Sequence, residues 1–240
     1  MKSQQHTKKD SVRINVRLVE LGVSSRKEAD AFIEQGLVRV NGIPATLGMQ
    51  VFPLDKIVID KKATGKKYVY FAYNKAPGIV TTNAQKDEID IIHETRFPEK
   101  VYPVGRLDKD SRGLIIMTND GRITKKLLDS EHAHEKEYVV TTEKHINDNF
   151  IKKISQGVDL SDFTTLPAKA KQLDDNVFSI ILIEGKNRQI RRMVARLYRT
   201  VVDLCRIRIE NIKLGDLPEG QFREIGGKEL QIFLKKLKIK

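Results

Sequence analysis

The run GRLDKDSRGLIIMTNDG, residues 105–121, joins a polar loop to a short apolar strand and then to a turn. The apolar residues at 114–117 predict the strand, and Asn119-Asp120-Gly121 predicts the turn into the next element. A polar loop held by a rigid strand is a common position for catalytic side chains. Arg106 and Asp108 lie two residues apart, so their side chains would point the same way in an extended backbone. On this pattern alone, a local ion pair is the simpler interpretation.

Patterns on both sides of this run predict an α+β chain. The segments from residue 68 onward would form a mixed sheet with helices packed on it. Strands are expected near residues 68–73, 113–118, 138–142, 177–183 and 201–209, and helices near 122–129, 146–155 and 188–198.

Residues 12–60 form a separate unit in this interpretation, because they carry their own start and stop signals. Ser25 and Glu28 have the spacing of a capping box, which predicts a helix start at Ser25. Gly36 is placed just past the end of that helix. Asn41-Gly42 is a strong signal for a type I′ hairpin.

The chain has 240 residues, a length that suits two domains. We expect a small first domain over residues 1–60, a charged linker over 61–67 and a larger second domain over 68–240. No stretch approaches the roughly 20 apolar residues of a membrane span, and the N-terminus lacks the apolar core of a secretory signal. We therefore expect a cytoplasmic protein that does not bind membranes, and a monomer. The single cysteine, Cys205, excludes an internal disulfide.

Net charge indicates the class of partner. Lys and Arg number 44 against 32 Asp and Glu, which gives a charge of +12. A chain this basic is expected to bind a polyanion, with RNA or DNA first, although some small cytoplasmic proteins are simply basic. The histidines show no metal-ligand spacing apart from His132 and His134, which we interpret as a loop feature. Neither a metal nor a cofactor is expected.

An arginine-rich segment predicts an RNA-facing helix over residues 188–199. At about 100° per residue, one side holds four arginines and the opposite side is apolar. The outer arginines are Arg188, Arg192, Arg196 and Arg199. Because no Asp or Glu lies between Lys186 and Thr200, we expect Arg188 and Arg192 to contact RNA phosphates. The alternative is a solvated helix face.

Four separated motifs resemble those of the pseudouridine synthases of the RsuA/RluB/RluE/RluF family. Residues 105–121 resemble its central motif, HEKEY at 134–138 the segment with its tyrosine, and EGKNRQIRRM at 184–193 its third motif. NKAPG at 74–78 resembles a family loop, although Ala76 departs from the more common NKPxG order. The similarity spans residue 12 to about residue 230. Within the family the motifs look most like the RluF type, which modifies a uridine in large-subunit (23S) ribosomal RNA.

The segment GVSSRKEADAFIEQGLVRVNG, residues 22–42, resembles an S4-type RNA-binding domain. The resemblance implies two helices and a small sheet, and RNA contacts around Ser24, Arg26 and Lys27. Basic side chains near a helix start would add charge to backbone N–H groups that already favour anions. A solvated face is the alternative for Arg26 and Lys27.

The family resemblance also implies a set of roles in the second domain. Asp108 would be the catalytic carboxylate, and Arg191 would keep it ionised. Tyr138 would stack on the target base and serve proton transfer, and Arg106 would fill the space that the flipped base leaves. Lys75 and Lys136 would contact the RNA backbone at most. The resemblance further implies a largely antiparallel sheet with the active site in a cleft.

The implied reaction suits a carboxylate without a cofactor. Uridine and pseudouridine are isomers, so the N-glycosidic bond must break, the base must turn and carbon 5 must bond to the ribose. No redox step or energy input is needed. A carboxylate can stabilise charge on the sugar or form a covalent adduct. Attack on the ribose, attack on the base and assistance to an elimination all remain open.

The leading interpretation is site-specific isomerisation of uridine in ribosomal RNA, with large-subunit RNA favoured over small-subunit RNA and transfer RNA. A non-catalytic S4-type assembly factor would explain the charge, but not Asp108 and Tyr138 in their family positions. A carboxylate-dependent glycosidase or nucleosidase would normally need two catalytic carboxylates.

Overall fold

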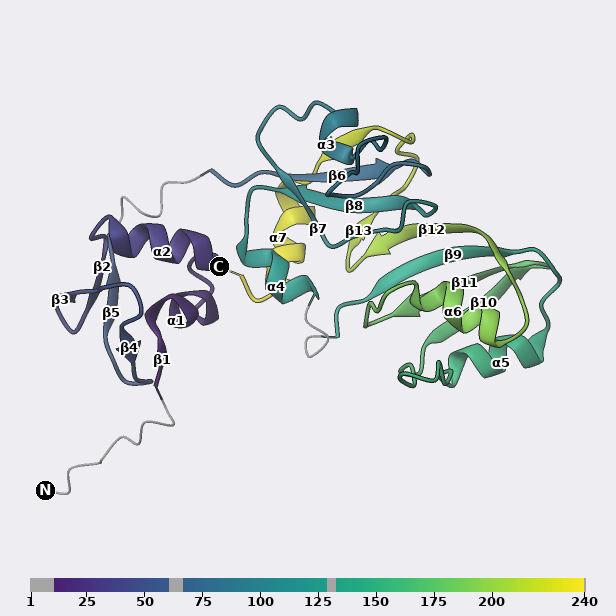
Figure 1. Ribbon diagram of the computed structural model, residues 1–240, viewed down its shortest axis with the longest axis horizontal. Helices are drawn as coiled ribbons and strands as arrows, with labels where there is room; N and C mark the ends of the chain where they lie inside the picture. Colours follow the sequence, from purple (N-terminus) through teal and green to yellow (C-terminus); the bar gives the residue numbers. More distant parts are fainter. Residues whose placement is uncertain (1–10, 61–66, 129–132, 240) are drawn as a thin grey trace, which may run out of the picture. The chain divides into compact units, whose positions relative to one another are not determined.

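The computed structural model describes residues 11–60, 67–128 and 133–239 (Figure 1). These residues form two compact units, the first built mainly from residues 11–68 and the second from 69–119 and 123–237. The expected linker, residues 61–67, lies outside the described residues except for Lys67.

The first unit has two helices and two small sheets around one apolar core. Ile14, Leu18, Ala29, Ile33 and Val38 are among the buried residues of this core. The elements are α1 (Ile14–Glu20), α2 (Arg26–Glu34), a sheet in the order β3 (Ile43–Pro44), β2 (Val38–Val40), β5 (Ile57–Ile59), and the pair β1 (Val12–Arg13) with β4 (Gln50–Val51).

Local sequence signals in this unit predicted its turns and caps correctly. The Ser25 side chain accepts a hydrogen bond from the Glu28 backbone N–H at 3.3 Å, and the Ser25 N–H donates to the Glu28 carboxylate at 3.0 Å. Gly36 follows α2 with φ of 71°. Asn41 and Gly42 both have positive φ, 52° and 85°, as a type I′ hairpin between β2 and β3 requires. The predicted capping box, helix end and hairpin are confirmed.

The second unit is built on one mixed sheet, which has nine strands among the described residues. Among the named strands that the structure describes, β8 and β12 pair in parallel and the other neighbours in this sheet are antiparallel. The strand order is β10 (Lys169–Asp174), β11 (Val177–Leu182), β9 (Lys136–Thr142), β12 (Val201–Ile209), β8 (Arg112–Thr118), β6 (Tyr70–Lys75), β14 (Phe222–Glu224), with β13 (Ile212–Lys213) on β12 and β7 (Tyr102–Val104) on β8. The predicted fold class is confirmed.

Helices cover this sheet. The core places Phe150 and Ile154 of α5 and Met193 and Val194 of α6 with buried strand residues such as Phe178. Figure 1 shows α5 and α6 beside the half of the sheet that contains β9 to β11. The helices are α3 (Ile91–Glu94), α4 (Arg122–Leu128), α5 (Asp148–Ser155), α6 (Gln189–Arg196) and α7 (Gly227–Lys236). None of the helices in the described part of the chain has the length and apolar character needed to cross a bilayer.

The parallel seam between β8 and β12 is unusually close. Gly113 pairs in register with Arg206, and a Cβ added to Gly113 would lie 2.4 Å from the Arg206 carbonyl oxygen. Gly113 also has φ of 107°, which side chains rarely adopt. Beside it, the Arg112 guanidinium donates two hydrogen bonds of 2.9 Å to the Asp203 carboxylate. The loop at 105–111 ends at this seam, so the seam places the loop next to β12.

Replacing Gly113 with alanine is expected to destabilise the second unit by about 3 kcal/mol or more, because the new Cβ meets backbone atoms in a strained conformation. Urea unfolding followed by circular dichroism measures the effect. Gly226→Ala is the matched control, since Gly226 has φ of −140° and no atom lies within 4 Å of an added Cβ. Equal unfolding midpoints for the two variants would show that the seam tolerates a side chain.

Candidate active site

The second unit contains a cleft of about 510 Å³. Its walls come from residues 80–82, the loop at 105–111 and residues 182–190, and its floor from strands β9, β11 and β12. The lining side chains include six cations (Arg106, Lys109, Lys136, Lys186, Arg188 and Arg206) and two carboxylates (Asp108 and Glu184). This excess of positive charge favours an anionic ligand.

The loop that carries Asp108 is held rigidly by hydrogen bonds to its own backbone. Each carbonyl oxygen from Leu107 to Ser111 accepts at least one hydrogen bond. The donors are the Thr81 hydroxyl to Leu107 at 2.8 Å, the Ser111 N–H to Asp108 at 3.0 Å, the Gly78 N–H to Lys109 at 2.7 Å, Arg191 Nη2 to Asp110 at 3.0 Å and Lys75 Nζ to Ser111 at 2.7 Å. A loop fixed in this way holds a side chain in one position.

Thr81 makes a reciprocal contact with the residue that precedes Asp108. Its hydroxyl donates to the Leu107 carbonyl oxygen and also accepts from the Leu107 N–H at 3.1 Å. The Thr81 side chain is buried and lines the cleft wall. Both backbone polar groups of Leu107 are therefore fixed by one oxygen atom.

Lys75 supports the same loop from inside the protein. It is fully buried, and its Nζ donates to the carbonyl oxygens of Ala76, Lys109 and Ser111. Burial lowers the pKa of Lys75 to about 8, although nearby carboxylates partly offset the shift. A fully buried ammonium that is bound to three carbonyl oxygens does not favour the expected contact of Lys75 with the RNA backbone, and that contact stays a prediction.

Asp108 itself lines the cleft with its side chain 29% exposed. Arg188 Nη1 lies 3.7 Å from its carboxylate. Arg106 also lines the cleft, but among the described residues it forms no ion pair with Asp108. The local ion pair that the spacing of these two residues allowed is therefore not formed.

Arg191 has a different partner from the expected one. Its Nη2 lies 3.3 Å from the Asp110 carboxylate and donates to the Ser111 hydroxyl at 3.2 Å. Arg188 donates to both carboxylate oxygens of Asp110, at 3.2 and 3.1 Å. Burial acts to raise the pKa of Asp110, but the hydrogen bond from Arg188 and the charge of Arg191 outweigh it and lower the pKa. Arg191 thus contacts the loop of Asp108 rather than its carboxylate.

The arginine-rich segment is only partly the helix that was expected. Arg188 precedes α6 in a left-handed conformation with φ of 46°, so it does not share a helical face with the later arginines. Arg192 forms an ion pair with Asp162, and Arg199 donates to the His145 carbonyl oxygen. These partners come from other segments, which the absence of acids within 186–200 could not predict. Phosphate contacts by Arg188 and Arg192 stay a prediction.

Tyr138 lies on the floor of the cleft. It is 8% exposed and pairs in register with Arg206 of β12. Lys136, two residues earlier on β9, also lines the floor, and its Nζ donates to the His134 carbonyl oxygen at 3.0 Å. Lys136 therefore lies on the floor of the cleft, and its expected contact with the RNA backbone stays a prediction. Sequence reasoning missed Arg206, although the alternation of β12 places Leu204 and Arg206 on one face.

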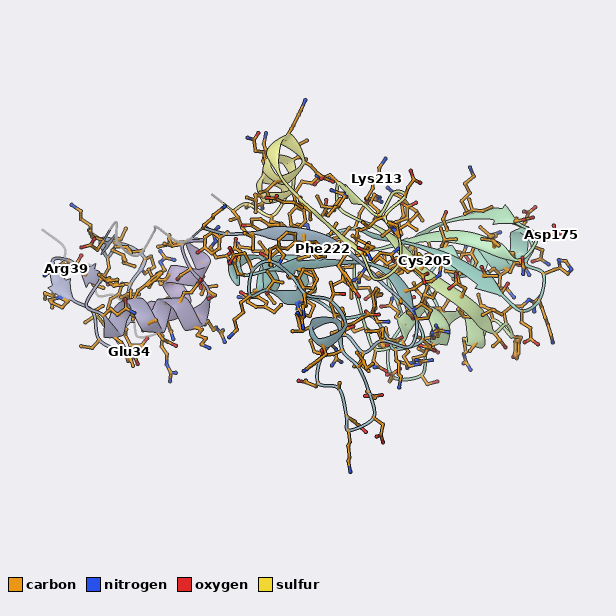
Figure 2. The ribbon with its side chains drawn as sticks, turned by 90° about the horizontal axis from the view of Figure 1, so that it is seen from above. Glu34, Arg39, Asp175, Cys205, Lys213 and Phe222 are labelled. Atoms are coloured by element: carbon orange, nitrogen blue, oxygen red, sulfur yellow. The ribbon has the colours of Figure 1, made fainter. Side chains whose placement is uncertain are left out.

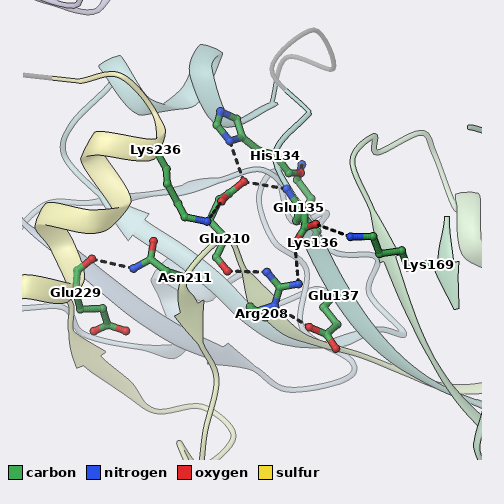
Figure 3. A network of polar contacts seen from close by, with 10 residues as sticks. All are labelled: His134, Glu135, Lys136, Glu137, Lys169, Arg208, Glu210, Asn211, Glu229 and Lys236. Carbon is green, nitrogen blue, oxygen red and sulfur yellow. Dashed lines mark hydrogen bonds and ion pairs between the residues drawn. The ribbon is translucent and has the colours of Figure 1, made fainter. Parts of the chain in front are cut away.

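A polar network supports the start of β9 behind the floor (Figure 3). Glu210 accepts hydrogen bonds from His134 Nδ1 and from the Glu135 N–H, both at 3.0 Å. Lys236 of α7 lies 2.7 Å from the same carboxylate. Arg208 contacts Glu135 and Glu137 from the neighbouring strand. The backbone around Lys136 is thus held by charged contacts with β12 and α7.

The candidate RNA-binding residues of the first unit differ in exposure. Arg26 and Lys27 are exposed in the first turn of α2. Ser24 is fully buried, which does not favour the expected contact with RNA, and that contact stays a prediction. Within the described residues no group of three or more His, Cys, Asp or Glu side chains could hold a metal ion, and His132 lies outside those residues.

Comparisons with known proteins agree with this architecture. Residues 12–57 match the S4 domain family, and residues 69–196 match the RNA pseudouridylate synthase family. The chain is 41% identical over 224 residues to the dual-specificity RNA pseudouridine synthase RluF of Escherichia coli K12, covering 92% of this chain and 77% of that protein. It is 32% identical over 230 residues to the ribosomal large subunit pseudouridine synthase B of Bacillus subtilis, covering 91% and 94%. A crystal structure of a pseudouridylate synthase superposes with a TM-score of 0.68 at 30% identity, over 94% of this chain and 99% of that one.

The buried Lys75 predicts a pH dependence of stability. Its pKa is about 8 in the folded protein against an ordinary value of 10.5, so the unfolded chain binds more protons between these values. The free energy of unfolding should therefore rise with pH in this window, by at most about 1.4 kcal/mol per pH unit from Lys75. Lys136, whose pKa is also about 8, adds a rise of the same sign.

Lys75→Met should reduce this rise and leave the part due to Lys136, measured by urea unfolding between pH 7.5 and 9.5. Lys171→Met, which changes an exposed lysine of β10, is the control and should keep the parental slope. An unchanged slope in Lys75→Met would contradict the assignment.

Thr81→Val should loosen the loop beside Asp108, because the valine keeps the volume but removes the hydroxyl. Loss of a hydrogen bond of about 1 kcal/mol should speed amide hydrogen exchange at Leu107 by roughly 5- to 10-fold. Thr81→Ser retains the hydroxyl and should exchange like the parent. Equal exchange in all three proteins would show that Thr81 does not hold the loop.

Proposed function

The chain belongs to the RNA pseudouridine synthases that carry an S4 domain, and we propose that it isomerises uridine in large-subunit ribosomal RNA with Asp108 as the catalytic carboxylate. The similarity to a B. subtilis enzyme that is named for the large ribosomal subunit supports this substrate. The E. coli relative is named a dual-specificity enzyme, so transfer RNA is the second substrate that we would test.

The observation that carries the proposal is the position of Asp108. Its carboxylate lines a cleft whose floor holds Tyr138, and its loop is fixed through every carbonyl from Leu107 to Ser111. A preorganised carboxylate of this kind can act without a change of backbone. The Arg188 guanidinium lies 3.7 Å from this carboxylate. The Tyr138 ring offers a flat surface for a flipped base, and its hydroxyl is the candidate for proton transfer.

Several basic side chains are proposed to bind the rest of the RNA. Arg106 at the cleft suits the space that a flipped base leaves, because its planar guanidinium can stack and also contact phosphate. Arg188 and Arg192 would add phosphate contacts at the cleft wall, and Arg26 and Lys27 would do so in the S4 domain. Arg191 is proposed to act indirectly, by holding Asp110 and Ser111 in the catalytic loop.

The first test measures tritium released to water from 23S ribosomal RNA that is labelled at uridine carbon 5. The parent should release tritium, and Asp108→Asn should lower the rate by about 1,000-fold or more, as loss of an essential catalytic group commonly does. RNA binding should be largely unchanged in this variant. The matched control is Asp175→Asn. Asp175, which Figure 2 labels, lies at the turn between β10 and β11 and its side chain is 81% exposed. Comparable turnover by Asp108→Asn and the parent would remove Asp108 from its role.

A separate set of reactions determines which RNA is the substrate. Parallel reactions with 16S ribosomal RNA, transfer RNA and assembly-stage large-subunit particles would identify the substrate. Release from transfer RNA alone would overturn the proposed substrate and keep the activity. Binding without release from any of these RNAs would favour the assembly-factor alternative.

A further inference from the structure

The floor of the cleft carries a buried guanidinium with incomplete contacts. Arg206 is 4% exposed, and its Nε donates to the Leu114 carbonyl oxygen at 2.7 Å. Its Nη2 is buried and has no hydrogen-bond partner among the described residues. A buried charged donor without an acceptor is strongly unfavourable. Because this donor lies beside an open cleft, we infer that its hydrogen-bond acceptor belongs to a ligand that binds there.

A second cation lies close to Arg206. Lys136 is 7% exposed and lines the same floor. Burial lowers the pKa of Lys136 to about 8, and the charge of Arg206 is the next largest cause. Within the described part of the chain, neither cation forms an ion pair with a carboxylate. Figure 3 shows that the nearby carboxylate of Glu210 contacts His134 and Lys236.

The proposed reaction generates the missing acceptor. When the bond between N1 and C1′ breaks, its electron pair stays with the uracil ring, where O2 and O4 carry the charge. When a nucleophile instead adds at C6, the electron pair of the C5=C6 bond moves towards O4. Either route places negative charge on a carbonyl oxygen of the base. C5 then bonds to C1′, the C5 proton leaves and N1 gains a proton, so the product is an isomer.

We propose that Arg206, with Lys136 beside it, forms an oxyanion site that holds a carbonyl oxygen of the flipped uracil and stabilises the charge that develops there. The inference rests on the proposed function. Donors that are aimed at developing charge in a closed site are among the strongest catalytic devices of enzymes. Tyr138, Leu182 and Leu204 line the same floor, and this flat, apolar surrounding suits a base better than a phosphate.

The test uses the full-length protein in excess over 23S ribosomal RNA labelled with tritium at uridine carbon 5. Arg206→Met should slow the single-turnover rate at saturation by about 100-fold, the usual effect of removing one oxyanion donor. RNA affinity by filter binding should change by less than about threefold, because phosphate contacts dominate affinity. Arg206→Lys keeps a cation and should recover part of the rate. Lys171→Met is the control and should match the parent.

Lys136→Met and Lys136→Arg form a second pair that does not depend on the folding of the Arg206 variants. Slow turnover by Lys136→Met with recovery by Lys136→Arg supports the oxyanion site, and equal loss in both overturns it. A parental rate for Arg206→Met overturns it as well. The proposal is also overturned if Arg206→Met loses RNA affinity alone and its binding depends less on salt than that of the parent. That result would mean that Arg206 contacts a phosphate. A parent that is inactive on every RNA removes the proposed function and this inference together.

Discussion

The second unit depends on the parallel contact between β8 and β12, where Gly113 meets the backbone of Arg206. This seam joins the strands β6, β7, β8 and β14 to the strands β9 to β13 in one sheet. Because the loop of Asp108 leads directly into β8, and Tyr138 lies on the strand beside β12, the seam sets their separation. A glycine is needed at position 113 because an added Cβ would lie 2.4 Å from the Arg206 carbonyl oxygen.

In the cleft, hydrogen bonds hold the loop backbone and charged side chains surround the Asp108 carboxylate. Neutral carbonyl oxygens of the loop are satisfied by Lys75, Thr81 and Arg191, which leaves the Asp108 carboxylate free of direct hydrogen bonds from them. Charge around the carboxylate comes from Arg188 at the wall. The floor carries two further cations, and one of them has an open donor. The backbone of the loop is thus held rigidly, while the Asp108 side chain faces the cleft where a substrate would bind.

Sequence patterns predicted most of the long elements, but not β10 or α7, and they predicted few of the contacts between segments. The five expected strands and the three expected helices of the second unit are present, because each carries a clear period or turn signal. The strands β7, β13 and β14 have two or three residues, too few for a period to appear. The partner of Arg191 and the burial of Lys75 and Ser24 depend on segments that are distant in sequence, so no local pattern could reveal them. Family resemblance located Asp108 and Tyr138, but it did not indicate Arg206.

The seam also constrains when the cleft can form during protein synthesis. Leu114 and Arg206, which are bonded across it, lie 92 residues apart in the chain. A nascent chain in which β12 is still inside the ribosome has the loop of Asp108 but lacks the part of the floor that β12 supplies. The cleft is therefore one of the last features to be completed, and an incomplete chain has the loop of Asp108 beside an unfinished floor.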